Sequence, residues 1–304
     1  MDRYFGIPIL LAIILGLMFP YTAIEISPYG IVFLFILMFN AGLGMDWQKF
    51  RRSTGRTGQI SIGLILLFIL FPLLQWLMAI FLVSDQQYVY GLVFASLCPV
   101  ALVAPHFSRL QGADAEIAYL LVLSSMILCP IVVPSVMYLL FSSSLSINIV
   151  PLARYMLILT VLPMLLSYVV TRYMPRLCTR IASFDAAINI AALSVLIFSL
   201  FGTAAGQIGF SYLDTKEILM LLGLVFFQDF GVYFIARFFL KQQFNDQIAE
   251  AIAISLGMKN VAIAAGVLLV YDPRSSIAPA LAFIAHAFFY TYLGRQRRIE
   301  RTTD

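Results

Sequence analysis

Long apolar stretches alternate with short polar segments along the whole chain. Ten of these stretches are long enough to cross the hydrocarbon of a bilayer, which takes about 20 helical residues for ~30 Å. They occupy residues 4–20, 28–45, 57–83, 88–110, 116–141, 149–172, 184–207, 215–240, 246–270 and 276–294. The pattern predicts an all-α integral membrane protein with ten transmembrane helices.

Two of the ten stretches contain residues that interrupt a helix. The fourth carries Pro99 and Pro105, and a proline inside a helix removes a backbone hydrogen bond. The ninth is weakened at Gly257. The fourth and ninth stretches hold the same place in two sets of five, and the second set starts from the opposite side of the membrane. The pattern therefore predicts two inverted five-helix repeats, residues 1–143 and 144–304, with broken helices 4 and 9.

The composition also indicates a membrane protein. The chain is 62% hydrophobic and 11% charged, whereas soluble domains are about 25% charged. No basic patch with interleaved aromatic residues points to nucleic acid, and no zinc-spaced histidines or nucleophile elbow points to an enzyme. Cys98, Cys129 and Cys178 have neither metal nor disulfide spacing. We expect no cofactor and no metal.

The basic residues gather on one side of the predicted membrane. That side holds fifteen of the nineteen: Arg3, Lys49, Arg51, Arg52, Arg56, Arg109, Arg172, Arg176, Arg180, Arg237, Lys241, Arg295, Arg297, Arg298 and Arg301. By the positive-inside rule, both termini are expected in the cytoplasm and the chain in the plasma membrane. The apolar run after Arg3 lacks a small-residue cleavage site and is expected to remain as the first helix.

Lys259 is a charged residue near the centre of the ninth apolar stretch. A charge at that depth costs roughly 2.5–3.5 kcal/mol on insertion scales. The ammonium could occupy the place of a bound cation, bind an anionic substrate directly, or exchange a proton. The alternative without a transport role is a static pair, or a side chain that reaches the interface.

Asp229, preceded by Gln228, is the second charge inside an apolar stretch. A buried carboxylate that faces a buried ammonium lowers the cost of both. We expect Asp229 within reach of Lys259, directly or through water, as a pair that responds to protons. A carboxylate that bonds only to local hydroxyls is the alternative.

Three short motifs carry a resemblance to a known family. The most specific is Gly257-Met258-Lys259-Asn260, which is similar to the ninth-helix motif Glu-x-Gly-x-Gln-Asn of the bile acid/sodium symporter family. Cys98-Pro99 and Phe71-Pro72-Leu73 are similar to its fourth and third helices. The resemblance implies a core of helices 3–5 and 8–10, in which the broken helices cross, and a panel of helices 1, 2, 6 and 7. It also implies an elevator-like motion between core and panel.

The departures from the family pattern concern its sodium ligands. The sodium-binding glutamate falls on Ser255, the neighbouring glutamine on Lys259 and a third-helix glutamine on Leu67. The fourth-helix Ser-Asn pair falls around Ala104 and Pro105. The fifth-helix hydroxyls fall near Ala118 and Val122, with Ser124 and Ser125 close by. The resemblance therefore supports the fold more than the sodium coupling.

The candidate site consists of the residues at the two breaks and the nearby polar residues. Together these are Lys259, Asn260, Ser255, Met258, Asp229, Gln228, Pro99, Pro105, His106, Ser124, Ser125, Gln75 and Asn40. For Gln75, Asn40, Asn189 and Ser194, interhelical hydrogen bonding is favoured over ligand contact. A lone His286 is more typical of a satisfied core residue.

The sequence thus predicts a secondary active transporter of a small organic, anionic solute. The coupling ion is left open between H⁺ and Na⁺, and the replaced ligands point away from the usual sodium sites. One alternative is an uncoupled facilitator or exporter, similar to arsenite exporters, in which Lys259 permanently replaces the cation. Another is a membrane receptor that does not transport. The expected partners are a small solute, the lipid bilayer and, as a possibility, a second copy of the chain.

Overall fold

The computed structural model describes residues 6–45, 55–142, 148–208 and 215–303, and within these ranges every regular element is helical. The first half contains α1 (Gly6–Met18), α2 (Pro20–Ile26), η1 (Ser27–Tyr29), α3 (Gly30–Leu43), α5 (Thr57–Ile65), η2 (Leu66–Leu70), α6 (Phe71–Leu82), α7 (Gln86–Leu97), α8 (Ala104–Leu110) and α9 (Ala115–Phe141). The second half contains α10 (Ile149–Met156), η3 (Leu157–Val161), α11 (Leu162–Tyr173), α12 (Pro175–Ala182), α13 (Asp185–Thr203), η4 (Ala204–Ile208), α14 (Thr215–Phe226), η6 (Phe227–Gly231), α15 (Val232–Leu240), α16 (Asp246–Gly257), α17 (Val261–Tyr271) and α18 (Ile277–Thr303). The elements η2, η3, η4 and η6 are π-helical turns inside longer helices.

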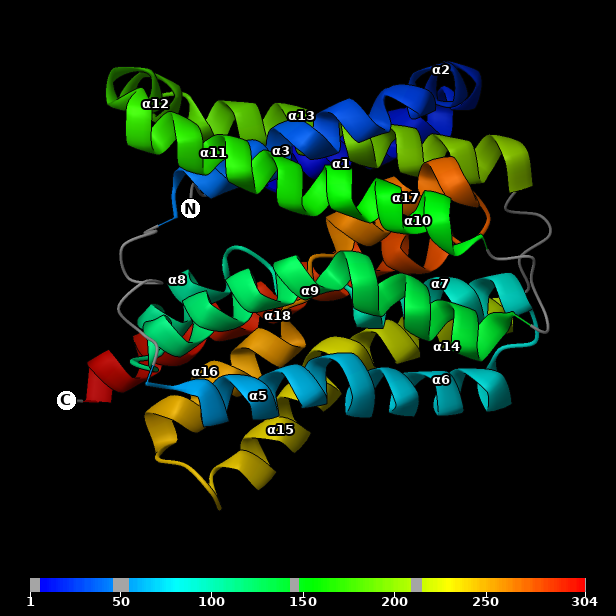
Figure 1. Ribbon diagram of the computed structural model, residues 1–304. Coiled ribbons are helices and arrows are strands. Elements are labelled where there is room, and N and C mark those ends of the chain that lie inside the picture. Colours follow the sequence, from blue (N-terminus) through cyan, green and yellow to red (C-terminus); the bar gives the residue numbers. More distant parts are fainter. Residues whose placement is uncertain (1–5, 46–54, 143–147, 209–214, 304) are drawn as a thin grey trace.

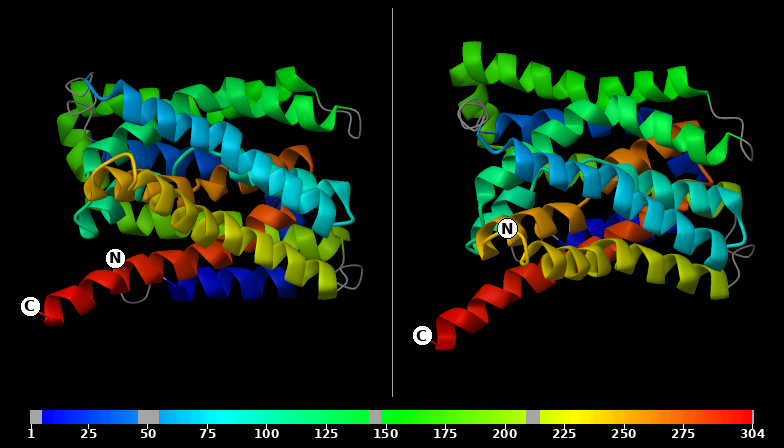
Figure 2. Two further views of the ribbon diagram at one scale, coloured as in Figure 1. Left: turned by 90° about the horizontal axis from the view of Figure 1, so that it is seen from below. Right: turned by 60° about the horizontal axis from the view of Figure 1, so that its bottom comes forward.

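The helices form two layers (Figures 1 and 2). One layer holds α1 to α3 and α10 to α13, with α13 packed against α1, α2 and α3. The other holds α5 to α9, α14 to α16 and α18. Helix α17 lies between the layers, because it packs both on α3 and on α7 and α18. Because α17 is the second half of the interrupted ninth helix, the two layers meet at this helix.

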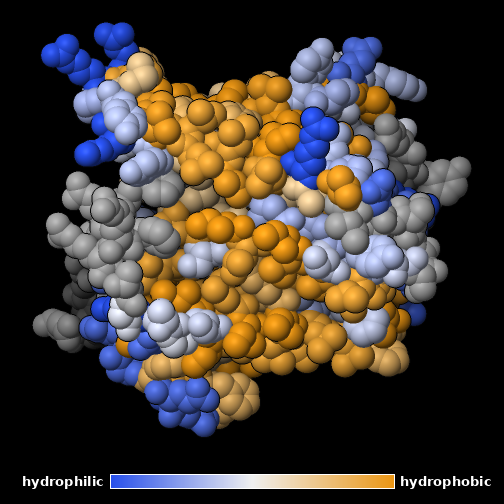
Figure 3. All heavy atoms as spheres, in the orientation of Figure 1, coloured by the Kyte–Doolittle hydropathy of each residue, from blue (hydrophilic) through white to orange (hydrophobic). Residues whose placement is uncertain are grey.

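Seven helices of the described ranges are long and apolar enough to span a membrane. They are Pro20–Leu43, Thr57–Leu82, Ala115–Phe141, Val150–Tyr173, Ala187–Gly206, Thr215–Leu240 and Ile277–Arg295. Of the other three predicted spans, the first is the short helix α1, and the fourth and ninth are broken into α7/α8 and α16/α17. Figure 3 shows a broad apolar surface between two ends where hydrophilic residues mainly gather, as a bilayer requires.

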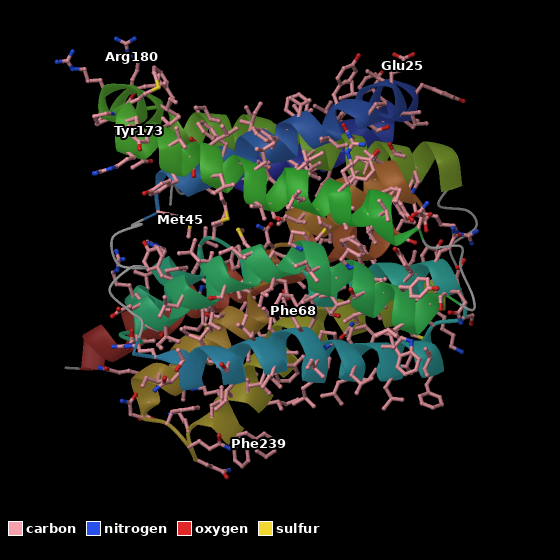
Figure 4. The ribbon with its side chains drawn as sticks, in the orientation of Figure 1. Glu25, Met45, Phe68, Tyr173, Arg180 and Phe239 are labelled. Atoms are coloured by element: carbon pink, nitrogen blue, oxygen red, sulfur yellow. The ribbon has the colours of Figure 1, made fainter. Side chains whose placement is uncertain are left out.

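Two segments that were expected as loops are helical. Pro20 ends α1 and begins α2, because a proline cannot continue a helix but fits at its first position. The basic segment after α11 forms α12, which has no buried residue. Arg180 of α12 lies at one end of the molecule and Glu25 at the other (Figure 4).

The described ends of the chain lie on one side of the bundle. Helix α1 begins, and α18 ends, toward the end that carries α12 (Figures 1 and 2). The cytoplasmic placement of both termini stays a prediction. Arg3, Lys49, Arg51 and Arg52, which contributed to that expectation, lie outside the described residues.

Charged pairs join helix ends outside the spans. Arg56, before α5, contacts Asp114, whose carboxylate also caps α9 through the N–H groups of Glu116 and Ile117. The hydrogen bond to Asp114 raises the pKa of Arg56. At the opposite end, Arg274 contacts Asp85. These pairs fix α5 against α9 and the start of α7 against the turn before α18.

Candidate functional site

The two helix breaks meet and pair with each other through their backbones. The fourth segment is extended after α7, and the ninth is extended between α16 and α17. The N–H of Ala101 donates to the carbonyl of Met258 at 2.7 Å, and the N–H of Asn260 donates to the carbonyl of Pro99 at 2.8 Å. These bonds flank an antiparallel bridge between Val100 and Lys259. The broken helices therefore cross, and we name this bridge with its two flanking residues on each strand the crossover.

Proline has a different role at each position of the fourth segment. The break begins beside Pro99, as predicted. Pro105 does not lie in the break but at the first turn of α8, where a proline is tolerated because its missing N–H needs no partner. The interruption is therefore shorter than the two prolines suggested, and Pro105 starts the second half-helix.

Neighbouring helices satisfy the outward-facing backbone groups of the crossover. The N–H of Val100 donates to the hydroxyl of Ser125 on α9 at 3.1 Å. The carbonyl of Lys259 lies 2.8 Å from Nε2 of His286 on α18. Extended backbone at membrane depth is tolerated only where such partners bury it. Ser125 thus belongs to the site as a backbone partner, whereas Ser124 beside it is half-buried.

The Lys259 side chain is buried, with 1% of its surface exposed. Its ammonium donates to the carbonyl of Leu67 at 3.4 Å. Leu67 lies in η2, where the N–H of Phe71 bonds to Leu66. The next possible donor along the helix is Pro72, which has no N–H. The carbonyl of Leu67 therefore lacks its usual helical donor and faces the ammonium instead.

Asp229 pairs with His286 and not with Lys259. Oδ2 of Asp229 lies 2.7 Å from Nδ1 of His286, although off the in-line direction of a ring N–H. Asp229 is fully buried and His286 is 4% exposed. Of the two arrangements expected, direct or through water, the direct Asp229–Lys259 contact is therefore wrong, and the water-mediated one stays a prediction. The imidazole lies between the carboxylate and the backbone of Lys259, because its other nitrogen contacts that carbonyl.

The remaining polar residues of the ninth and eighth segments are buried near the crossover. The hydroxyl of Ser255 donates to Ala251 in its own helix at 2.7 Å. Met258 is fully buried and contributes its carbonyl to the crossover. Gln228 is 1% exposed, and neither atom of its amide has a hydrogen-bond partner among the described residues.

Gln75 and Asn40 form interhelical bonds, as favoured from the sequence. The amide of Gln75 donates to the carbonyl of Leu224 on α14 at 3.2 Å. Asn40 on α3 donates to the carboxylate of Asp185 at 2.6 Å, and Asn189 bonds to the same oxygen at 2.9 Å. Asn40 is thus held by α13 and not by the crossover.

Asn260 and His106 have different surroundings. The amide of Asn260 lies 3.3 Å from the sulfur of Met38 on α3, so this residue faces the other layer. His106 is exposed on α8. The main contributor that sequence reasoning missed is His286, since a single histidine in an apolar helix carries no pattern that names its partners.

An apolar helical bundle in which two broken helices cross beside a buried charge is typical of a membrane transporter. The comparisons with known proteins agree. The model of the sodium bile acid symporter family matches residues 31–210, more than half of the chain, and the chain belongs to this family. The match indicates a transporter rather than an enzyme.

Two relatives are similar over most of the chain. A protein of Bacillus subtilis described as the uncharacterized sodium-dependent transporter YocS is 22% identical over 291 residues, which cover 93% of this chain and 87% of the relative. The probable chloroplastic sodium/metabolite cotransporter BASS2 of Oryza sativa subsp. japonica is 21% identical over 228 residues, which cover 75% of this chain and 53% of the relative.

Proposed function

We propose that the chain is a secondary active transporter that moves a small organic anion across the plasma membrane by alternating access at the crossover. The observation that carries this proposal is the buried Lys259 ammonium beside two crossing half-helices. Charges are rarely buried in membranes without a function, and ion or substrate pathways are where they are kept.

The chain is proposed to contain ten membrane segments as two inverted five-helix repeats, residues 1–143 and 144–304. The spacing of the irregular elements supports this division. The break in the fourth segment begins 32 residues after the start of η2 (66 to 98), and the break in the ninth begins 31 residues after the start of η6 (227 to 258). Paired interruptions in two halves are the expected mark of such repeats.

The two layers are proposed to be the moving parts. The core would comprise helices 3–5 and 8–10, and the panel helices 1, 2, 6 and 7. Asn260 supports this division, because its amide meets Met38 across the boundary between the layers. A displacement of the core past α3 would carry Lys259 and Asn260 from one side of the membrane to the other.

The ammonium is proposed to bind the anion. An ammonium has three N–H donors, and the contact with Leu67 at 3.4 Å is longer than the usual 2.7–3.2 Å of an N–H···O bond. Lys259 therefore retains donor capacity for a carboxylate. The amide of Asn260 and the start of α17 add further N–H groups, which favour negative charge.

The usual sodium sites are proposed not to operate here, although both relatives carry sodium in their descriptions. Lys259 places a positive charge where the family holds a glutamine. Leu67 is apolar, and the hydroxyl of Ser255 is bonded within its own helix. A proton gradient is the energy source that remains consistent with these residues.

Uptake into proteoliposomes tests this function. The full-length protein is reconstituted, and uptake of a panel of ¹⁴C-labelled small mono- and dicarboxylates is measured with an inward proton gradient, with a sodium gradient and with neither. We expect accumulation of at least one acid with the proton gradient, and its loss in Lys259→Met. Lys241→Met, at the exposed end of α15, is the matched control.

Several results would contradict the proposal, including the absence of uptake for every acid of the panel. Uptake that Lys259→Met leaves unchanged would remove the lysine from the site. Accumulation with a sodium gradient alone would show that a sodium site survives without the family's ligands. Equilibration that no gradient enhances would instead identify an uncoupled facilitator.

A further inference from the structure

The imidazole of His286 lies between two hydrogen-bond acceptors. Nε2 is 2.8 Å from the carbonyl of Lys259, and Nδ1 is 2.7 Å from Oδ2 of Asp229. A neutral imidazole has only one N–H, and an ionised carboxylate has none. If both groups were deprotonated in this way, one short contact would join two lone pairs. An additional proton, on the carboxylate or on the ring, would remove this repulsion, after a small rotation of either group to bring the contact in line.

We propose that Asp229 and His286 form a proton-binding site, separate from the Lys259 ammonium, that carries the coupling proton of transport. This inference rests on the proposed function and names the coupling ion and its residues. In the loaded state the proton is shared between Oδ2 of Asp229 and Nδ1 of His286. In the unloaded state the imidazole is neutral and keeps its N–H on Nε2, so that the bond to the carbonyl of Lys259 is retained.

Few other titratable groups surround the Asp229–His286 pair. The titratable groups that face the pair are Lys259 at the crossover and Tyr290 on α18. Cys98, just after α7, and Cys129 on α9 face Lys259 instead. Tyr290 lies edge-on to the imidazole, with ring centroids 5.5 Å apart. Thiols and phenols are neutral near pH 7, so Lys259 is the only full charge among these neighbours.

A second charged group in the same layer balances its own charge. Tyr233 donates to Glu250 at 2.5 Å, and the other oxygen of Glu250 lies 2.5 Å from Nε of Arg237. The ring of Phe289 on α18 lies 5.4 Å from that of Tyr233. Because the charges of Glu250 and Arg237 cancel, this group contributes no net charge to the proton site.

Charge balance predicts how many protons accompany the substrate. Without the extra proton, Lys259 and Asp229 carry +1 and −1 and sum to zero. With the proton the sum is +1, and one bound monoanion returns it to zero. Because uncompensated charge is costly at membrane depth, the core moves either empty and unprotonated or loaded with one proton and one monoanion. Transport is thus electroneutral.

Histidine NMR tests the proton site without a substrate. The chain has two histidines, and His106→Gln leaves His286 as the only source of a ring signal. The full-length variant is labelled with ¹⁵N-histidine, purified in detergent and titrated over roughly pH 5 to 9, the range in which histidine charge states change. We expect both ring nitrogens to move between the protonated and the neutral pattern, with the neutral N–H on Nε2.

The partner of His286 is tested by Asp229→Asn in the same background. An amide has no negative charge to share the proton, so we expect the neutral ring pattern at every pH at which this variant is folded. A ring that keeps one pattern throughout in His106→Gln alone, either neutral or protonated, would overturn the proposal. That result is independent of whether Asp229→Asn folds.

The charge balance is tested with any acid that the uptake panel identifies. Proton-driven uptake of a monoanion should remain unchanged when valinomycin and K⁺ impose a membrane potential, and potential-driven uptake would overturn the one-to-one ratio. If no acid is taken up but His286 titrates, the proposed function fails and the proton site stands. If uptake occurs and His286 does not titrate, the proton site fails alone.

Discussion

Gly257→Ala tests whether α16 must pack closely against η6 to hold Lys259 near the Asp229–His286 pair. A Cβ at this position would lie 2.7 Å from the backbone oxygen of Asp229 and 3.1 Å from two ring carbons of Phe289. Ordinary contact begins near 3.4 Å, so the oxygen would have to move by about 0.7 Å, which a packed interior resists. That oxygen accepts the N–H of Val232, the first residue of α15, and therefore cannot move without the helix.

The expected magnitude follows from two opposing effects. Overpacking of a well-packed interior costs typically 1–3 kcal/mol. Replacing glycine by alanine inside a helix gains up to about 1 kcal/mol, but Gly257 is the last residue of α16, where the gain is smaller. We therefore expect a net destabilisation of about 1–2 kcal/mol, the difference of the two effects.

Thiol reactivity provides the assay, since Cys98 and Cys129 are buried and react with a maleimide dye only on unfolding. Cys178→Ser removes the partly exposed thiol from the background. Gly223→Ala on α14 is the matched control, because its Cβ would meet no atom within 4 Å. Scans at one heating rate should show a lower unfolding temperature for Gly257→Ala than for the Cys178→Ser parent, whereas Gly223→Ala should equal or exceed the parent. A Gly257→Ala variant as stable as the parent would refute the close packing inferred for η6.

Two further variants concern the crossover and its neighbours. Ser125→Ala leaves the N–H of Val100 without its partner and should destabilise by about 1–3 kcal/mol, with Ser124→Ala close to wild type in the same thermal assay; equal losses would contradict the role of Ser125. The triple variant Leu67→Gln, Ser255→Glu and Lys259→Gln restores the three sodium ligands of the family. NaCl should stabilise it more than KCl or choline chloride at equal ionic strength, since a ligand that binds only the folded state stabilises that state. Equal stabilisation by the three salts would show that further sodium ligands are missing.

The helical segments could be predicted from the sequence because their cause is local. Unbroken apolar runs must satisfy their own backbone in lipid and therefore form helices. Pro99 and Gly257 marked the two interruptions for the same reason. The prediction was less accurate where local rules compete, as at Pro20, which begins α2 where a loop was expected.

The partners of the site residues could be predicted only in part. Interhelical bonds of Gln75 and Asn40 were favoured, but Leu224 and Asp185 could not be named. Asp229 was expected beside Lys259, because two opposite charges in lipid attract each other. The structure instead places His286 between the carboxylate and the backbone of Lys259.

The sequence by itself determined that the chain is a membrane bundle, where two helices break and that a lysine is buried beside one break. Local chemistry also determined that Pro72 cannot donate to the carbonyl of Leu67. Only the tertiary structure decided that the Lys259 ammonium donates to the carbonyl of Leu67, 192 residues away in the chain. The same holds for the contact between the His286 ring and the Asp229 carboxylate. The physical reason is that these contacts depend on how separate helices pack, and each apolar helix offers many faces of similar burial energy. Hydrogen bonds between polar side chains fix which face of a helix packs inward, and these bonds form only once the partner helices are assembled.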